Sequence, residues 1–384
     1  MANSMLTMQN IARMALPILE EQLVFPNLIN KDYSNDFVKK GDTIQVKRPA
    51  VYVADEFGGT VNLQDVNPYP IYVKMDTIAD VSVEIGSAEM ALEMHDFEND
   101  VIRPAVTAIA EKINQDGLAQ YKYVNSFTGT AGTTPDGLDD IANARKNLNN
   151  NKAPMGGRNA VWDPDADSKL SIVDAIVNAE KSGSTEALRE GAIGRIQQIN
   201  NFMSQAVKTH TAGGYTALAD VKATVDVSAV NATDATTGYK YTPLTLESTA
   251  GASTAKLLKG DLLVIAGNSY VVIEDTAAAI AGDVTAKVYP QLTADLSAVA
   301  VTFPDVTAGG HVANLAFHPK AFAFVSRPLE APQGGADSYT TNYNGLTIRV
   351  TRGYDMSTKK EQISFDVLYG YATPYPELAT RILG

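Results

Sequence analysis

The chain has 384 residues, enough for two domains and a sizeable core, and it carries a formal net charge of −13 with no cysteine. This charge argues against tight binding to a phosphate backbone, and the lack of cysteine excludes disulfides and thiolate metal sites. No apolar run reaches 18 residues, and residues 1–22 lack the basic start and apolar core of a signal peptide. We therefore expect a soluble protein that is made in a cytoplasm and has no membrane partner.

The chain begins with a predicted helical arm. Apolar residues within 5–23 fall on roughly one helical face, and Pro17 predicts a kink or a break. A helical arm at a chain end more often packs on the core or on a neighbour than on a membrane. We therefore expect this arm to make protein contacts.

Residues 39–86 are predicted to form a long two-stranded β-ribbon. Apolar and polar residues alternate around Ile44 and again around Val83, and turn signals at Gly58-Gly59 and Asn67-Pro68 interrupt the middle. A ribbon of this kind is marginal in water when it is isolated. It needs a surface to lie against.

A long helix is predicted over 96–124, where apolar residues recur at helical spacing. Asp96 is placed to cap this helix, and Pro104 falls early enough to be tolerated. A shorter, more polar helix follows near 138–148, and the strand "NAVW" comes after it.

The stretch "WDPDADSKL" places aspartates at 163, 165 and 167, which is how an EF-hand calcium loop begins. The pattern then fails, because Ser168 stands where the loop needs Gly and Asp174 where it needs Glu. A helix start fits better: Asp163 is a suitable N-cap, Pro164 suits the first helical position, and the next two aspartates complement the helix dipole. Apolar residues then continue at helical spacing: Leu170, Val173, Ile176 and Val177.

Composition changes over 211–310, which is rich in Ala, Thr, Val, Asp and Gly and lies within an arginine-free stretch from Arg195 to Arg327. Short strand patterns recur here, and "LLVIAGNSYVVIED" predicts a hairpin that turns at Gly267-Asn268. We expect a separate all-β domain inserted into an α+β host. The alternative, a flexible Ala/Thr linker, fits less well because too many apolar strands alternate in it.

No chemical motif emerges from the sequence. The histidines at 95, 210, 311 and 318 form no zinc-binding pattern, and no nucleophile elbow, P-loop or dinucleotide fingerprint is present. A lone histidine is more often a hydrogen-bonded structural residue than a ligand. Short basic pairs such as Lys47-Arg48 are interpreted as salt-bridge partners rather than a DNA footprint. We expect no catalytic residue, metal site or cofactor.

Six stretches, taken in order, resemble one family. They are "KGDTIQVKRP", "AVTAIAEKINQDGLAQYKYV", "LREGAIGRIQQINNFMSQAV", "KGDLLVIAGNSYVV", "NLAFHPKAFAFVSRPLEAP" and "FDVLYGYATPYPELATRILG". The chain resembles the major capsid (coat) proteins of tailed bacteriophages, in particular the short-tailed-phage coat-protein family that carries an inserted β domain. The fold this implies is α+β, the tailed-phage and herpesvirus-type major capsid fold (Hong Kong phage type).

The resemblance also implies a division of the chain. It assigns 1–40 to an N-terminal arm, 41–85 to an extended loop, and 86–124 to a peripheral domain with its spine helix. Residues 125–210 and 311–384 supply the axial domain and the remaining peripheral strands, and 211–310 form the inserted β domain.

The implied function is mechanical: copies form hexamers and pentamers that close into an icosahedral shell around double-stranded DNA. The resemblance implies a scaffolding protein and a portal protein as partners, no sequence-specific DNA binding, and a place in the virion after synthesis in the host bacterial cytoplasm. Two alternatives from the residues alone stay open. One is an adhesin-like or carbohydrate-binding structural protein, and the other is a hydrolase that uses carboxylates.

Candidate inter-subunit residues lie in the ribbon. Lys47 and Arg48 at its base and Asp55 and Glu56 near its tip carry opposite charges. Repeated around a ring, this polarity could pair the tip of one subunit with the base or the spine helix of the next. Each exposed ion pair contributes only about 0–1 kcal/mol, so closure would depend on many copies.

Overall fold

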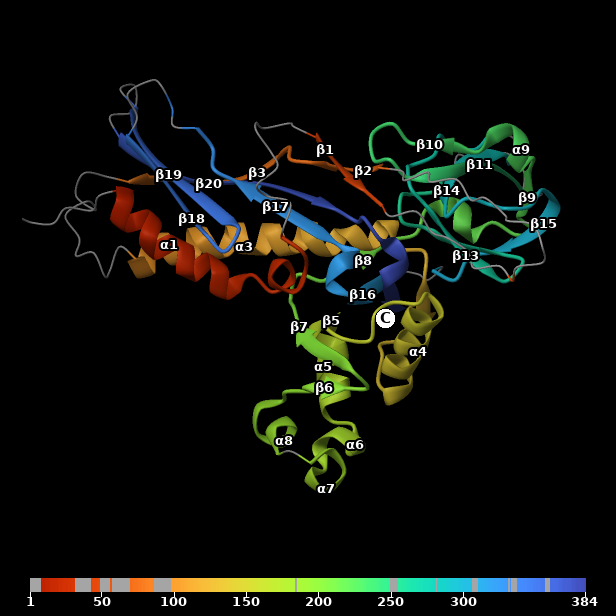
Figure 1. The fold of residues 1–384 in the computed structure, drawn as a ribbon, viewed down its shortest axis with the longest axis horizontal. Coiled ribbons are helices and arrows are strands. Elements are labelled where there is room, and N and C mark those ends of the chain that lie inside the picture. Colours follow the sequence, from red (N-terminus) through yellow and green to blue (C-terminus); the bar gives the residue numbers. More distant parts are fainter. Residues whose placement is uncertain are drawn as a thin grey trace, which may run out of the picture.

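The computed structural model describes residues 8–31, 43–48, 56, 70–85, 98–183, 185–248, 255–280, 282–305, 310–330, 332, 337–355 and 360–384. The molecule is elongated, with a long sheet and two helices at one end, a small barrel at the other, and a third lobe projecting to one side (Figure 1). Helices and strands are mixed along the chain, as expected for an α+β fold.

Two helices cover one face of the long sheet. Helix α1 (Met8–Gln22) lies beside α3 (Arg103–Leu118), and both pack on strands of the sheet. Helix α1 continues through Pro17, so the break expected there does not occur. Helix α3 is preceded by a π-helical turn, Glu98–Ile102, and followed by a 3₁₀ turn, Ala119–Tyr123. The predicted helix 96–124 is thus present from residue 98, with Pro104 in its first turn, while Asp96 lies outside the described residues.

The long sheet has the order β17-β20-β19-β18, and β3 pairs with the other edge of β20. All these pairs are antiparallel. The strands are β3 (Thr77–Ile85), β17 (Ala323–Arg327), β18 (Asp337–Tyr343), β19 (Leu346–Asp355) and β20 (Lys360–Ala372). The main apolar core lies between this sheet and the two helices, with Phe25, Phe317 and Phe322 packed edge to face or tilted.

The ribbon differs from its prediction. Its described strands are β1 (Thr43–Lys47) and β2 (Pro70–Lys74), which pair antiparallel. Strand β3 is not part of the ribbon and pairs with β20 in the long sheet. The apolar face of the ribbon base is covered by its own chain, because Val46 and Val73 pack with Val325 and Leu368. Gly370 makes this approach possible, since a Cβ there would lie 2.2 Å from the Lys74 carbonyl oxygen. Apart from Glu56, residues 49–69, which include the predicted tip at 54–65, lie outside the described residues.

The projecting lobe is built on a second sheet of order β4-β21-β16-β5-β7-β6, with β8 also paired to β16. Its strands are β4 (Phe127–Gly129), β5 (Arg158–Trp162), β6 (Arg195–Ile196), β7 (Ile199–Met203), β8 (Thr209–His210), β16 (His311–Phe317) and β21 (Ala379–Leu383). Its helices are α4 (Leu138–Asn150), α5 (Pro164–Ser171), α6 (Asp174–Val177), α7 (Ala179–Ser182) and α8 (Glu186–Glu190). Trp162 is fully buried at the centre of this lobe.

The aspartate-rich stretch begins helix α5, as predicted. The Asp163 carboxylate accepts a hydrogen bond from the Asp165 backbone N–H at 3.2 Å, and Asp165 and Asp167 occupy the first turn. The helix ends at Ser171, so Val173, Ile176 and Val177 do not continue it. Among the described residues these aspartates are not part of any group able to hold a metal ion.

Strands between residues 222 and 302 close into a barrel with its own apolar core. The ring runs β9-β11-β14-β13-β12-β15 and returns to β9, and β10 (Ala232–Thr233) extends it beside β11. The ring strands are β9 (Lys222–Val225), β11 (Lys240–Glu247), β12 (Leu262–Ile265), β13 (Asn268–Val272), β14 (Val284–Tyr289) and β15 (Leu296–Thr302), with the short helix α9 (Val227–Val230) nearby. The predicted hairpin is present, but it turns at Ala266 and Gly267, which both have positive φ, rather than at Gly267-Asn268.

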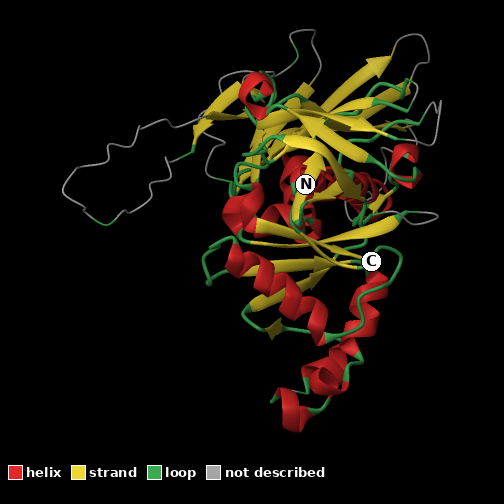
Figure 2. Cartoon of the chain, turned by 90° about the vertical axis from the view of Figure 1, so that its right-hand side faces the viewer, coloured by secondary structure: helices red, strands yellow, loops and turns green. Residues whose placement is uncertain are grey.

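Figure 2 shows the barrel and the long sheet in the upper half of the molecule and the projecting lobe below. Among the described helices, none combines the length and the apolar character that crossing a lipid bilayer would require.

Candidate functional site

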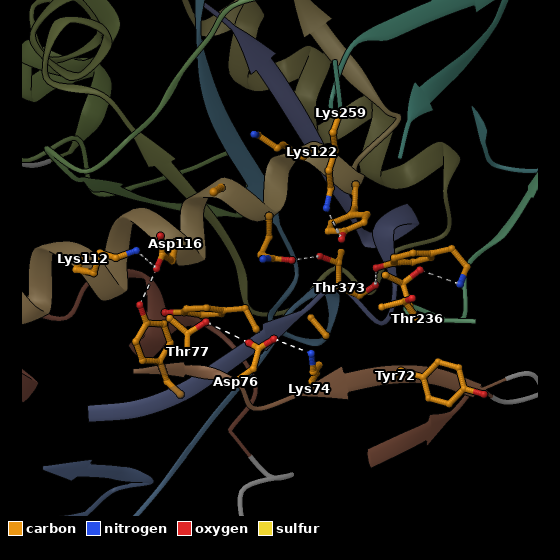
Figure 3. Close-up of a pocket in the computed structure, with 18 residues that line it drawn as sticks. Tyr72, Lys74, Asp76, Thr77, Lys112, Asp116, Lys122, Thr236, Lys259 and Thr373 are labelled. Carbon is orange, nitrogen blue, oxygen red and sulfur yellow. Dashed lines mark hydrogen bonds and ion pairs between the residues drawn. The ribbon is translucent and has the colours of Figure 1, made fainter. Parts of the chain in front are cut away.

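A cavity of about 530 Å³ lies where the ribbon base, the end of α3, the barrel and the end of β20 meet. Figure 3 shows the side chains that line it. They come from five separate parts of the chain: Tyr72 to Thr77, Lys112 to Tyr123, the barrel loop Thr236 to Tyr239, Lys259 of the barrel, and Tyr369 to Thr373. The cavity therefore lies at the junction of the ribbon base, the barrel and the long sheet with its helix, rather than within one of them.

Four lysines and two aspartates line the cavity, which gives it a formal charge of +2 in a strongly acidic chain. Two of these lysines have acidic partners: Lys74 contacts Asp76 at 3.1 Å, and Lys112 contacts Asp116 at 2.5 Å. Asp116 also accepts a hydrogen bond of 2.6 Å from the Tyr369 hydroxyl. The charges of these two lysines are thus balanced by the two aspartates within the cavity itself.

The other two lysines lack an acidic partner within the described part of the chain. The Lys259 ammonium donates to the Tyr123 hydroxyl at 2.6 Å and lies 4.1 Å from the centre of that ring. Lys122 is half-buried and forms no ion pair with a described residue. The positive charge of the cavity is therefore concentrated at its barrel side, where an anionic group would be attracted.

The barrel loop is fixed closely on the ribbon base. The Tyr72 backbone N–H donates to the Thr237 carbonyl at 3.0 Å, and the buried Tyr239 hydroxyl donates to the Thr373 carbonyl at 2.5 Å. Gly238, with φ of +79°, brings the two backbones together, because a Cβ there would lie 2.3 Å from the Pro70 carbonyl oxygen. Glycine is the residue that adopts this conformation and leaves this space.

A buried polar cluster lies behind the cavity. His210 Nε2 is 3.0 Å from Asp261 Oδ1 and 3.8 Å from Asp305 Oδ2, and His210 Nδ1 is 2.9 Å from the Tyr121 hydroxyl. The guanidinium of Arg381 donates to the Gly260 carbonyl at 2.7 Å and lies 5.1 Å from the centre of the Tyr121 ring. This cluster joins the end of α3, strand β8, the barrel and β21.

Burial shifts the protonation equilibria in this cluster. It raises the pKa of Asp305 to about 6, with the nearby Asp261 carboxylate adding to the effect, and it lowers the pKa of His311 to about 4. It also lowers the pKa of Arg381 to about 10. Within the described residues, His210, Asp261 and Asp305 are the group that could hold a metal ion. The histidines form no zinc-binding motif in the sequence, but the fold places His210 beside the carboxylates of Asp261 and Asp305.

Of the four ribbon residues named from the sequence, the structure describes the side chains of Arg48 and Glu56. Arg48 is buried, pairs with Glu377 and lies 4.9 Å from the centre of the Tyr375 ring, so it is engaged within its own subunit. Lys47 ends strand β1, and its side chain is not among those described. Glu56 is exposed, and Asp55 lies outside the described residues.

Sequence reasoning missed the lysines of the cavity and the buried cluster. Their members are far apart in the chain, and none belongs to a local motif: His210, Asp261 and Asp305 are separated by about 50 residues each way. The available signal was Asp261 in "KGDLLV", an acidic residue directly before a strand that is apolar at every position. A charge at such a place is buried or nearly so and needs a partner.

Comparison with known proteins gives a family match over part of the chain and matches to solved structures. Residues 271–384 match the family described as "P22 coat protein - gene protein 5". A structure from Mycobacterium phage Che8 is 14% identical, covers 94% of this chain and 90% of its own, and has a TM-score of 0.51. The capsid structure of Cyanophage P-SCSP1u is 13% identical, with coverage of 90% and 84% and a TM-score of 0.47. No curated protein sequence matches the chain.

The resemblance to tailed-bacteriophage major capsid proteins is confirmed, and the chain has their mixed α and β fold. Within that class, the family it matches is that of the P22 coat protein, over the segment that runs from the end of β13 to the C-terminus.

Proposed function

We propose that the protein is a major capsid protein whose copies assemble as hexamers and pentamers into an icosahedral shell around double-stranded DNA. The match of residues 271–384 to the P22 coat protein family carries the proposal, and the Che8 phage structure supports the fold. The role is non-enzymatic, with the virion as its location and the host bacterial cytoplasm as the place of synthesis. A scaffolding protein and a portal protein are the further partners.

The acidic composition supports a shell that contains DNA without gripping it. With a formal net charge of −13, the chain as a whole repels a phosphate backbone. DNA held in such a shell stays mobile along the inner wall, which suits a container better than a DNA-binding protein.

We also propose that 211–310 is an insertion domain. Two observations support it: the barrel has an apolar core separate from the main core, and the ends of the segment meet. His210 pairs directly with His311 where β8 joins β16, so the chain leaves and re-enters the host at one place. A segment whose ends are adjacent can be inserted without disturbing the host fold.

The ribbon is the proposed inter-subunit element, and Asp55 and Glu56 near its tip are its acidic contacts. Arg48 at the ribbon base is not the basic partner of this tip in the next subunit, because its buried guanidinium already pairs with Glu377. Lys122 at the end of the spine helix is the better partner, since it lies at the positive cavity and has no acidic partner among the described residues. The tip of one subunit then pairs with the spine helix of the next.

Electron microscopy of the expressed protein, with its scaffolding protein, tests the whole proposal. Closed shells of uniform size are expected, and monomers or fibres would contradict the capsid function. Glu56→Lys and Lys122→Glu should each reduce the shell yield, and the double variant should restore part of it because the pair is rebuilt with reversed charges. If the shell yield of the double variant falls by the sum of the two single losses, Glu56 and Lys122 do not pair, while the capsid function stands. Lys112→Glu is the matched control, because Lys112 already has Asp116.

A further inference from the structure

We propose that His210, Asp261 and Asp305 bind one divalent cation of the zinc type in the buried cluster between the barrel and the rest of the chain. The inference concerns the chain's own geometry and does not depend on capsid assembly. The three side chains are 3% exposed or less, and one ligand atom from each lies within 4.8 Å of the others.

The spacing of the ligand atoms fits tetrahedral coordination. With metal–ligand bonds of about 2.1 Å, two ligand atoms in a tetrahedral site are roughly 3.4 Å apart. His210 Nε2 lies 3.0 Å from Asp261 Oδ1 and 3.8 Å from Asp305 Oδ2, so the two distances bracket this value. Small side-chain rotations bring both to the required separation.

An unpartnered atom in the same place points to something that completes the cluster. Asp305 is fully buried, and its Oδ1 has no hydrogen-bond partner among the described residues. The rings of His210 and His311 lie 5.3 Å apart, centre to centre. Buried polar atoms are nearly always paired. The Asp305 carboxylate therefore has free capacity for a cation.

The surroundings of His210 suit a metal-bound imidazole. Metal-binding histidines usually donate their second ring N–H to an oxygen, which fixes the ring. Here Nδ1 lies 2.9 Å from the Tyr121 hydroxyl. Without a cation, Nε2–H donates to Asp261 and the Tyr121 hydroxyl donates to Nδ1. With a cation on Nε2, Nδ1–H donates to the Tyr121 oxygen, so both states are satisfied.

The charges select the kind of cation and limit its affinity. Two carboxylates neutralise a divalent ion, while the buried Arg381 leaves one positive charge and weakens binding. Without a cation, the same groups carry a net negative charge when both carboxylates are ionised. Calcium and magnesium prefer six or more oxygen ligands, which this site does not supply. One imidazole and two carboxylates instead suit zinc.

A bound cation would link three parts of the chain. His210 belongs to β8 of the host, and Tyr121 follows helix α3. In the barrel, Asp261 directly precedes β12 and Asp305 follows β15 by three residues. The expected consequence is a barrel held more firmly to the host.

The test uses the purified full-length chain, freed of metal with a chelator. Calorimetric titration with ZnCl₂ should show one ion bound per chain, and zinc should raise the temperature of unfolding. Tyr121→Phe should weaken binding by about 10–100-fold, as removal of an outer hydrogen-bond partner does. Asp305→Asn should abolish binding, while His318→Gln should not change it, because His318 lies elsewhere and bonds to the Lys320 backbone.

Three results would overturn the proposal. They are no stoichiometric binding to the wild type, binding that persists unchanged in Asp305→Asn, and binding that is lost in His318→Gln. Should Asp305→Asn fail to fold, the visible spectrum of the wild type with Co²⁺ decides. Four-coordinate bands support the site, and the spectrum of the six-coordinate aqueous ion refutes it.

Discussion

Replacing Arg48 with alanine should destabilise the monomer, although the sequence pattern alone assigned this residue to contacts between subunits. The Arg48 side chain is 10% exposed and pairs with Glu377, whose side chain is 35% exposed. Its guanidinium also lies over the Tyr375 ring, 4.9 Å from the centre. The substitution removes the charge partner, the ring contact and the apolar stem at once.

The size of the effect follows from these exposures. Breaking a fully buried ion pair costs about 3–5 kcal/mol, and an exposed pair is worth about 0–1 kcal/mol. Because the Glu377 side chain is partly exposed although its Oε2 is buried, the pair lies between these limits at about 1.5–3 kcal/mol. The ring contact adds roughly 0.5–1 kcal/mol. We therefore expect Arg48→Ala to lower the free energy of unfolding by about 2–4 kcal/mol.

Urea unfolding of the unassembled protein, followed by circular dichroism, measures this change. Arg48→Lys should recover only part of the loss, because an ammonium lacks the planar group that lies on Tyr375. Glu56→Lys is the contrasting variant: Glu56 is exposed, so its stability should change by no more than about 0.5 kcal/mol. If Arg48→Ala unfolds at the wild-type urea concentration yet fails to assemble, Arg48 acts between subunits and our reasoning is wrong.

Three further predictions concern the attachment of the barrel, the cap of helix α5 and the buried polar cluster. Gly238→Ala should cost about 2 kcal/mol or more, because its Cβ would collide with the Pro70 carbonyl and its φ is positive, and limited proteolysis should then release the barrel sooner. Asp163→Ala should lower the unfolding free energy by about 1 kcal/mol through loss of the N-cap, and calcium should change neither protein's melting temperature. As the pH rises between about 4 and 6, the raised pKa of Asp305 makes folding less favourable, whereas the lowered pKa of His311 makes it more favourable. Asp305→Asn removes the first effect and keeps the second. Urea midpoints should therefore rise with pH in that variant and stay nearly flat in the wild type.

The sequence predicted those elements whose signal is local. The cap at Asp163, the stripe of α3 and the hairpin in "LLVIAGNSYVV" each depend on neighbours within a few residues, and all are present. The ribbon was predicted less well, because alternation around Val83 indicates a strand but not its partner. Strand β3 pairs with β20, almost 300 residues further on, and periodicity carries no information about such a pairing.

The candidate sites could not be found in this way. Arg48 and Glu377 are 329 residues apart, and the cavity takes lysines from the ribbon, the spine helix and the barrel. A lysine on a solvated helix face and a lysine at a module joint look alike in sequence. Only the fold shows that Lys122 and Lys259 face the same cavity (Figure 3).

The hairpin β12–β13 shows why the barrel is attached where it is. Leu263 and Val272 point into the barrel core, as alternation requires, yet Leu262 and Val271 on the opposite face are equally buried. Their cover comes from the ribbon base and from Leu383, so this hairpin is apolar on both faces. A strand covered on both sides has a continuous apolar sequence. Inward substitutions in this hairpin therefore act on the barrel itself, whereas outward ones act on its attachment, and the polar cluster beside it supplies the directional contacts that apolar packing lacks.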